Sequence, residues 1–401
     1  MSAPGISASI RRGLGQIVAM AAALAVFHAP ALAQPDPSGI DFVTITHPGN
    51  AAWAGNGTPG DRAVGRGAVG YEYRIGRYEV TTAQWVEFFN AAYDRADAPL
   101  PHLFPPNFWG AVGATPNNPG RQRWTVPAGN EMLPVGNISW RMAAMYCNWL
   151  HNDKSLDRAA FLNGAYDVST FGYVGGSAVF TDQLTRHTDA RFWIPSWDEW
   201  LKAAHYDPYK VNGDGTTGGW WTQPNGTNTP LWYGPPGVRV GVVNNQPVPD
   251  PNGPFAQANA GWHPGQFPGT PFSIPLGAYP GIASPFGLLD VAGATTEWTE
   301  GVISLGGQPF ARVFDGSQWD ISLSSALAKD LLANRGGDFP SLSTYDLGFR
   351  IASQIPGPWG LTAGVLLCIR AIGRSRKGDS HGQSRKHVRY QSGSCRGGGR
   401  V

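Results

Sequence analysis

Cysteine and charged residues are both scarce in this sequence. The 401 residues include three cysteines: Cys147 lies in the body of the chain, and Cys368 and Cys395 lie near its C-terminus. Three dispersed cysteines exclude the disulfide framework that holds many small exported domains together. Charged side chains make up 14% of the chain, against about 25% in an ordinary soluble domain. The fold must therefore be stabilised by burying aromatic side chains, or by bound metal.

Glycine, proline and tryptophan are abundant instead. The chain has 54 Gly, 34 Pro and 16 Trp, and aromatic residues make up 12% of it. So many glycines and prolines interrupt regular structure, which argues against a coiled coil, a helical bundle or a helical repeat array. The aromatic content argues against disorder, because disordered chains contain few aromatic residues. The composition predicts a packed globular protein built mostly from loops, turns and short elements.

The net charge of +2 is the sum of an acidic body and a basic C-terminal segment. Residues 370–401 hold nine basic side chains and one acidic one, whereas residues 34–369 hold 19 basic and 27 acidic side chains. Nucleic-acid binding needs clustered Lys and Arg to neutralise phosphates. The mildly acidic body therefore predicts that nucleic acid is not a partner.

Residues 1–33 have the three parts of an export signal. Arg11 and Arg12 supply a basic region, residues 17–27 form an apolar run, and residues 31–33 form a small-x-small cleavage site. The apolar run is shorter than the roughly 20 residues that span a bilayer. We predict a cleaved signal peptide, a mature chain beginning at Gln34, and a location in the periplasm, at the cell surface or outside the cell.

Capping residues predict where three short helices begin. Thr81 with Gln84, and Ser196 with Glu199, form capping-box pairs, and Ser139 is a lone N-cap. Behind each cap, apolar residues recur at helical spacing, and we interpret these faces as core rather than as cofactor sites. Short runs rich in β-branched and aromatic residues predict five strands. These lie at residues 41–46, 71–75, 191–194, 312–314 and 349–352.

The segment 206–285 is rich in residues that break regular structure. Its 14 Gly and 15 Pro predict a long, irregular loop region rather than regular elements. Loops of this length are usually functional or disordered, and Trp220, Trp221, Trp232 and Trp262 favour order here. We expect most of these Trp side chains to fill the core beneath the loops, and the remainder to offer a contact surface.

A series of short motifs occurs in a recognisable order along the chain. They are Tyr78-Glu79-Val80-Thr81, Asn148-Trp149-Leu150, Asn163-Gly164-Ala165-Tyr166-Asp167, Ile194-Pro195-Ser196 with Asp198-Glu199-Trp200, residues 285–293 with Glu297-Trp298-Thr299, Gly316-Ser317, Arg335 and Leu347-Gly348-Phe349-Arg350. Together they resemble the formylglycine-generating enzyme, or sulfatase-modifying factor, family over residues 40–353. The resemblance implies one domain at residues 34–353 with an α+β fold. That fold is the loop-rich, complex variant of the C-type-lectin fold, with short helices around small antiparallel sheets.

The same resemblance bears on catalysis. Active enzymes of the family oxidise a substrate cysteine with oxygen, at a copper ion held by two cysteines five residues apart after the glycine-serine turn. The matching positions here fall at or near Asp320 and Ser325, and residues 316–350 contain no cysteine. Oxygen ligands do not replace thiolates on soft Cu(I), so copper is not expected and no catalytic residue is assigned. Cys147 lies on the apolar face of the second predicted helix, where a buried, structural thiol is the better interpretation.

The resemblance also implies a calcium site in the turn at residues 290–297. The matching residues are Asp290, Gly293, Thr295 and Glu297. Two carboxylates and two backbone carbonyls would supply the hard oxygen ligands that Ca²⁺ requires. The turn departs from the family at Ala294, where the family usually has Asn, and at Thr296, where it often has Trp. The alternative is that Asp290 and Glu297 only pair locally, and the sequence leaves both open.

The sequence changes character after residue 353. A Pro-Gly-Pro motif at residues 356–358 leads into an apolar stretch at residues 359–369 and then into a basic cluster. Over residues 354–377 this resembles a bacterial C-terminal sorting tag, with Gly in place of the Glu of its Pro-Glu-Pro motif. The alternative is a flexible basic tail that touches anionic surfaces and continues over residues 378–401. Arg370 interrupts the apolar stretch, so we expect transient membrane contact and not a permanent anchor.

Three functions are compatible with these observations. The first is an exported, non-catalytic binding module whose aromatic and polar loops contact a protein or glycan ligand. The second is a divergent metal-dependent oxidoreductase of the formylglycine-generating or non-haem-iron kind. The third is a structural surface or matrix protein in which the C-terminal segment matters more than the fold. The missing cysteine pair favours the first.

Overall fold

The computed structural model describes residues 36–356, except residues 94, 96 and 114–122. The predicted signal peptide, the C-terminal tail and all but the first three residues of the predicted sorting tag lie outside this range. In the described part of the chain, no helix has both the length and the apolar character needed to cross a bilayer.

A four-stranded antiparallel sheet joins the two ends of the described chain. Its strands, in order across the sheet, are β1 (Phe42–Ile45), β2 (Tyr73–Gly76), β14 (Ala352–Ser353) and β5 (Phe192–Trp193). Ala352 lies opposite Ile75 on one side and opposite Trp193 on the other, so the last strand is inserted between two earlier ones. The predicted strands at residues 41–46, 71–75 and 191–194 correspond to β1, β2 and β5.

A second four-stranded sheet contains the longest strands. Its order is β12 (Gly336–Asp338), β11 (Gln308–Asp315), β10 (Thr296–Leu305) and β13 (Leu347–Gly348). β10 and β11 form an antiparallel hairpin whose turn, Gly306-Gly307, has φ of 59° and 79°, a conformation that favours glycine. β13 pairs with β10 in parallel, so this sheet is mixed and not antiparallel throughout as expected. The strand expected at residues 312–314 is the middle of β11.

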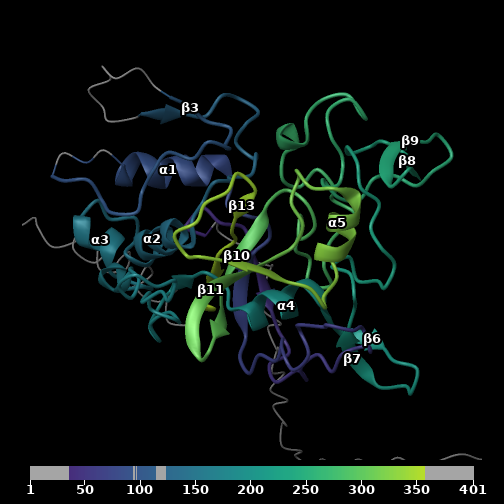
Figure 1. Ribbon diagram of the computed structural model, residues 1–401, viewed down its shortest axis with the longest axis horizontal. Helices are drawn as coiled ribbons and strands as arrows, with labels where there is room; N and C mark the ends of the chain where they lie inside the picture. Colours follow the sequence, from purple (N-terminus) through teal and green to yellow (C-terminus); the bar gives the residue numbers. More distant parts are fainter. Residues whose placement is uncertain (1–35, 94, 96, 114–122, 357–401) are drawn as a thin grey trace, which may run out of the picture.

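In the described residues, five short helices surround the sheets. They are α1 (Thr82–Ala92), α2 (Trp140–His151), α3 (Arg158–Leu162), α4 (Trp197–His205) and α5 (Leu323–Lys329). The predicted caps are confirmed: Thr81 and Ser196 each begin a capping box, and the Ser139 side chain accepts from the Met142 amide. Figure 1 shows the β10–β11 hairpin at the centre, with α1, α2 and α3 on one side and α5 on the other.

Aromatic side chains form the core between α1, α2 and the C-terminal strands. Trp85 and Phe88 of α1 pack on Tyr146 and Trp149 of α2, and Trp85 also meets Phe349 with ring centroids 5.8 Å apart. All five rings are buried. Burial of an aromatic side chain of this size stabilises a fold by roughly 1.5–3 kcal/mol, so this cluster provides the stability that disulfides do not.

The segment 206–285 is more regular than its composition predicts. It contains two hairpins, β6 (Tyr206–Val211) with β7 (Thr217–Trp220) and β8 (Val240–Val243) with β9 (Gln246–Pro249). The turn of the second hairpin, Asn244-Asn245, has positive φ at both residues, which Asn tolerates better than most side chains. The expectation of a wholly irregular loop region was therefore wrong. Pro247 and Pro249 fit because this two-stranded ribbon leaves outer backbone groups unpaired.

Three remaining details complete the fold. The strand expected at residues 349–352 is instead a crossing between sheets, because the chain leaves β13 at Gly348 and enters β14 at Ala352. A two-stranded pair, β3 (Val112–Gly113) and β4 (Trp124–Thr125), lies beside α1. Single-turn 3₁₀ helices occur at Val168–Thr170 and at Pro271–Ser273.

Candidate ligand-binding face

The Glu297 carboxylate, predicted as a calcium ligand, is held in a buried ion pair. Arg350 donates from Nε and Nη2 to the two Glu297 oxygens, both at 2.6 Å, and Trp200 Nε1 donates to Glu297 Oε2 at 2.8 Å. Burial alone would lower the pKa of Arg350, but the Glu297 carboxylate raises it, so Arg350 stays charged. Both Glu297 oxygens are therefore already used.

Asp290, the Gly293 amide, and the Thr295 amide and hydroxyl also have protein partners. Asp290, at φ of 54°, accepts a hydrogen bond from the Gly277 amide at 2.6 Å, and burial raises its pKa to about 6. The Gly293 amide donates to Ser317 Oγ at 2.9 Å. Thr295 donates from its amide and its hydroxyl to Glu79. Asp290 and Glu297 each have their own partner, so they do not form the local pair considered as the alternative.

The Glu297 carboxylate, paired with Arg350, does not fit a calcium ligand in this arrangement. Ca²⁺ needs six to eight oxygen ligands, including carboxylates with free lone pairs, whereas Glu297 is neutralised by Arg350. Across the described residues, no group of three or more His, Cys, Asp or Glu side chains is placed to hold a metal ion. The function proposed below therefore does not depend on calcium, and the calcium site remains a prediction to be tested in solution.

The positions that match the copper cysteines lie at the start of α5. Asp320 Oδ1 is 3.6 Å from His263 Nδ1, and its hydrogen bond with the Tyr345 hydroxyl raises the Tyr345 pKa. Ser325 is exposed, and its amide donates to the N-cap Ser322 Oγ at 3.2 Å. Neither position offers the soft sulfur ligand that Cu(I) prefers. Cys147 is fully buried in α2, and burial raises the pKa of its thiol, so it supplies no thiolate.

Beside Asp320 lies a partly exposed aromatic cluster of Phe108, Phe272, Trp319 and Tyr345. The ring centroids of contacting pairs are 5.0–6.0 Å apart, with Phe108 touching the other three. Tyr345 is 38% exposed. Four distant chain segments thus bring their rings to one surface. The Trp319 indole N–H is buried and bonds no described residue, so its hydrogen-bonding capacity is unused within the fold.

A chain of hydrogen-bonded polar side chains involves residues next to this aromatic cluster in the sequence. Lys329 Nζ donates to Gln318 Oε1, and Gln318 Nε2 donates to Asp346 Oδ2, both at 2.5 Å. Burial lowers the pKa of Lys329, while nearby carboxylates, Asp346 first among them, raise it. Because Gln318 and Asp346 adjoin Trp319 and Tyr345 in sequence, this network fixes the segments that carry two of the rings.

The Trp residues of segment 206–285 mostly serve the core. Trp220 and Trp262 are buried and Trp221 is half-buried, whereas Trp232 is 36% exposed. Trp232 lines an apolar groove of about 310 Å³ together with Leu323 and Leu327 of α5. Of the four Trp residues in this segment, Trp232 is therefore the one that remains a candidate contact residue. The larger aromatic cluster was missed, because its members are separated by 26 to 164 residues and no periodicity links them.

The sequence matches the family of the sulfatase-modifying factor enzyme 1-like domain over residues 31–355. Similar solved structures include CarF, at 18% identity and a TM-score of 0.43, covering 79% of this chain and 99% of that one. Treponema denticola variable protein 1 matches at 17% identity with a TM-score of 0.43, and the match covers 78% of this chain and 95% of that protein. PvdO from Pseudomonas aeruginosa matches at 14% identity with a TM-score of 0.43, and the match covers 80% of this chain and 97% of PvdO. Among proteins of curated function, none matches significantly.

Proposed function

Because the chain belongs to the sulfatase-modifying factor family, with its loop-rich C-type-lectin-like fold, we propose that it is an exported binding module without the family's cysteine-oxidation chemistry. In this proposal the aromatic cluster of Phe108, Phe272, Trp319 and Tyr345 is the contact surface. The fold supplies a rigid scaffold, and loops at one surface supply the recognition.

The residues at the copper positions support the loss of oxidase chemistry. Asp320 and Ser325 offer hard oxygen atoms, and the Asp320 carboxylate is engaged with Tyr345 and close to His263. Cys147, the one cysteine in the described residues, is enclosed in the aromatic core. A cysteine oxidase needs thiolate ligands within reach of its substrate, which these residues do not supply.

The composition of the exposed surface supports a glycan as the ligand. Aromatic rings give a large, rigid contact area at low conformational cost, and the Tyr345 ring is 38% exposed. The carboxylates of Asp320 and Asp346 lie in the same loops and accept hydrogen bonds from hydroxyl groups. The single observation that carries the proposal is this partly exposed aromatic cluster beside the replaced copper position.

A glycan array probed with the full chain tests the proposal. We expect binding to a defined subset of glycans, and Trp319→Ala should weaken it by about tenfold or more, as for a central contact residue. Trp232→Ala is the matched control, because Trp232 is also part-exposed but lies in the separate groove beside α5. Binding that survives Trp319→Ala, or that Trp232→Ala abolishes instead, would place the contact surface elsewhere; no glycan binding would remove the glycan assignment.

A further inference from the structure

A cavity of about 320 Å³ lies where the two ends of the described chain meet. Residues 36–38 line it from the N-terminal end, and residues 354–356 line it from the C-terminal end. Leu150 of α2 and Phe192 of β5 form its apolar wall. The volume falls within the range of small-molecule sites, which combine apolar walls with a few placed polar groups.

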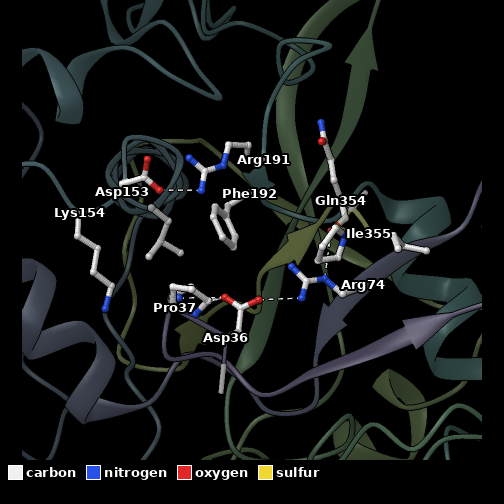
Figure 2. Close-up of a pocket in the computed structure, with 12 residues that line it drawn as sticks. Asp36, Pro37, Arg74, Asp153, Lys154, Arg191, Phe192, Gln354 and Ile355 are labelled. Atoms are coloured by element: carbon white, nitrogen blue, oxygen red, sulfur yellow. Dashed lines mark hydrogen bonds and ion pairs between the residues drawn. The ribbon is translucent and has the colours of Figure 1, made fainter. Parts of the chain in front are cut away.

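Two ion pairs face this cavity on either side of the Phe192 ring (Figure 2). Arg74 Nη1 donates to Asp36 Oδ2 at 2.7 Å, and Arg191 Nη2 donates to Asp153 Oδ1 at 2.7 Å. Both guanidinium groups are also anchored. Arg74 Nε donates to a hydroxyl and a main-chain carbonyl, and Arg191 Nη1 donates to a main-chain carbonyl of α2. Their positions are therefore set before any ligand arrives.

Each guanidinium group also has an N–H donor that no described residue uses. Among the described residues, none accepts a hydrogen bond from Nη2 of Arg74 or from Nε of Arg191. Lys154 also lines the cavity, and its Nζ bonds the exposed Glu87, which is not a lining residue. With Glu87 included, the three cations and the three carboxylates balance, so it is the unused guanidinium donors of Arg74 and Arg191, not a net charge, that favour an anion.

The backbone at the end of α2 holds two of these charged residues in an unfavourable conformation. Asp153 and Lys154 have φ of 53° and 59°, the left-handed region in which glycine is the favoured residue. Asp tolerates this region through its short polar side chain, but Lys has no such compensation. Lys154 therefore occupies a position after α2 where glycine would be less strained. Strain of this kind is concentrated at binding sites.

We propose that this cavity binds a small organic carboxylate that carries an apolar group. The apolar group lies against Leu150 and Phe192. The carboxylate accepts hydrogen bonds from the unused donors of Arg74 and Arg191 and is attracted by Lys154. Bonds from guanidinium to carboxylate are among the stronger hydrogen bonds, and the apolar wall selects against small inorganic anions. This site is separate from the aromatic cluster and does not depend on the proposed glycan binding.

Calorimetric titration of the full chain with three probes tests this assignment. N-acetyl-phenylalanine, benzoate and hexanoate each join a carboxylate to an apolar group, and the corresponding amides keep the apolar group without the charge. We expect binding of at least one carboxylate, and about tenfold weaker binding of its amide, because a charge-assisted hydrogen bond is lost. Acetate, which lacks the apolar group, should bind more weakly still. Failure of all three carboxylates to bind, or equal affinity for the amides, overturns the proposal.

Two variants separate binding from folding. Lys154→Gly should weaken carboxylate binding while leaving Tm unchanged or higher, because glycine relieves the left-handed strain at this position. Arg191→Gln, at a side chain that is 47% exposed, should weaken binding about tenfold with little effect on Tm. Arg77→Gln is the matched control, because Arg77 forms a similar exposed pair with Asp41 away from the cavity. Unchanged affinity in both cavity variants, or an equal loss in the control, overturns the assignment.

Discussion

Removing the Arg350 side chain tests the buried ion pair that holds the Glu297 carboxylate. Arg350 makes two bonds of 2.6 Å to Glu297, and both side chains are buried. Its remaining donors bond main-chain carbonyls of Gly76, Arg77, Leu289 and Asp290. In Arg350→Met the Glu297 carboxylate would keep Trp200 Nε1 as its neutral donor and would have no cation beside it. Breaking a buried pair from one side costs about 3–5 kcal/mol, a large share of a total stability of about 5–15 kcal/mol.

Urea unfolding of the full chain measures this loss. We expect the free energy of unfolding to fall by about 3–5 kcal/mol in Arg350→Met, and by less in the double variant Arg350→Met/Glu297→Met, because the double variant leaves no unpaired buried charge. Arg77→Met is the control, since the Arg77 side chain is 35% exposed in its pair with Asp41 and should cost about 1 kcal/mol or less. An Arg350→Met loss as small as that of the control, or a double variant less stable than Arg350→Met, would refute the buried pair.

Three further predictions follow from buried groups and from the N-terminal signal. Burial raises the pKa of Asp315 from its ordinary value of 3.8 to about 8, so between these values the folded state keeps a proton that the unfolded state releases. The free energy of unfolding should therefore fall as the pH rises from about 4 to 8, by up to about 1.4 kcal/mol per pH unit. Asp315→Asn should flatten that slope in urea titrations, and an unchanged slope would assign it to another group. Calcium should not alter Tm relative to chelator while Glu297 is paired with Arg350; a Ca²⁺-dependent rise that Asp290→Ala abolishes would restore the calcium site. N-terminal sequencing of the exported protein should begin at Gln34, and retention of residues 1–33 would contradict a cleaved signal.

Local sequence patterns predicted the helix starts well, because capping involves residues only three apart. The Thr81 and Ser196 capping boxes need no information from the rest of the fold. β10, the longest strand, was not predicted because its first five residues are buried on both faces and show no alternation. The hairpin turn at Asn244-Asn245 was a usable signal, but the many prolines around it outweighed it.

The site depended on contacts between distant residues, which one sequence does not reveal. Glu297 and Arg350 are 53 positions apart, and the family motifs marked both without showing that they pair. The absence of cysteine near Asp320 was visible at once, since it requires only the residue types. The aromatic cluster around Trp319 and Tyr345 was not visible, because it exists only when four separate loops meet. The sequence therefore revealed the missing copper ligands, but it did not reveal the aromatic surface that the fold assembles.

Copper content and oxygen uptake together test the central claim that this domain does not oxidise thiols. The full chain would be incubated with Cu(I), freed of excess metal, and supplied with a cysteine-containing peptide in an oxygen electrode, with parallel samples loaded with iron. Hard oxygen groups at Asp320 and Ser325 predict substoichiometric copper and no peptide-dependent oxygen uptake above the protein-free rate. One equivalent of bound copper or iron, with oxygen consumption that requires the peptide thiol, would contradict the account and identify the domain as a divergent oxidoreductase.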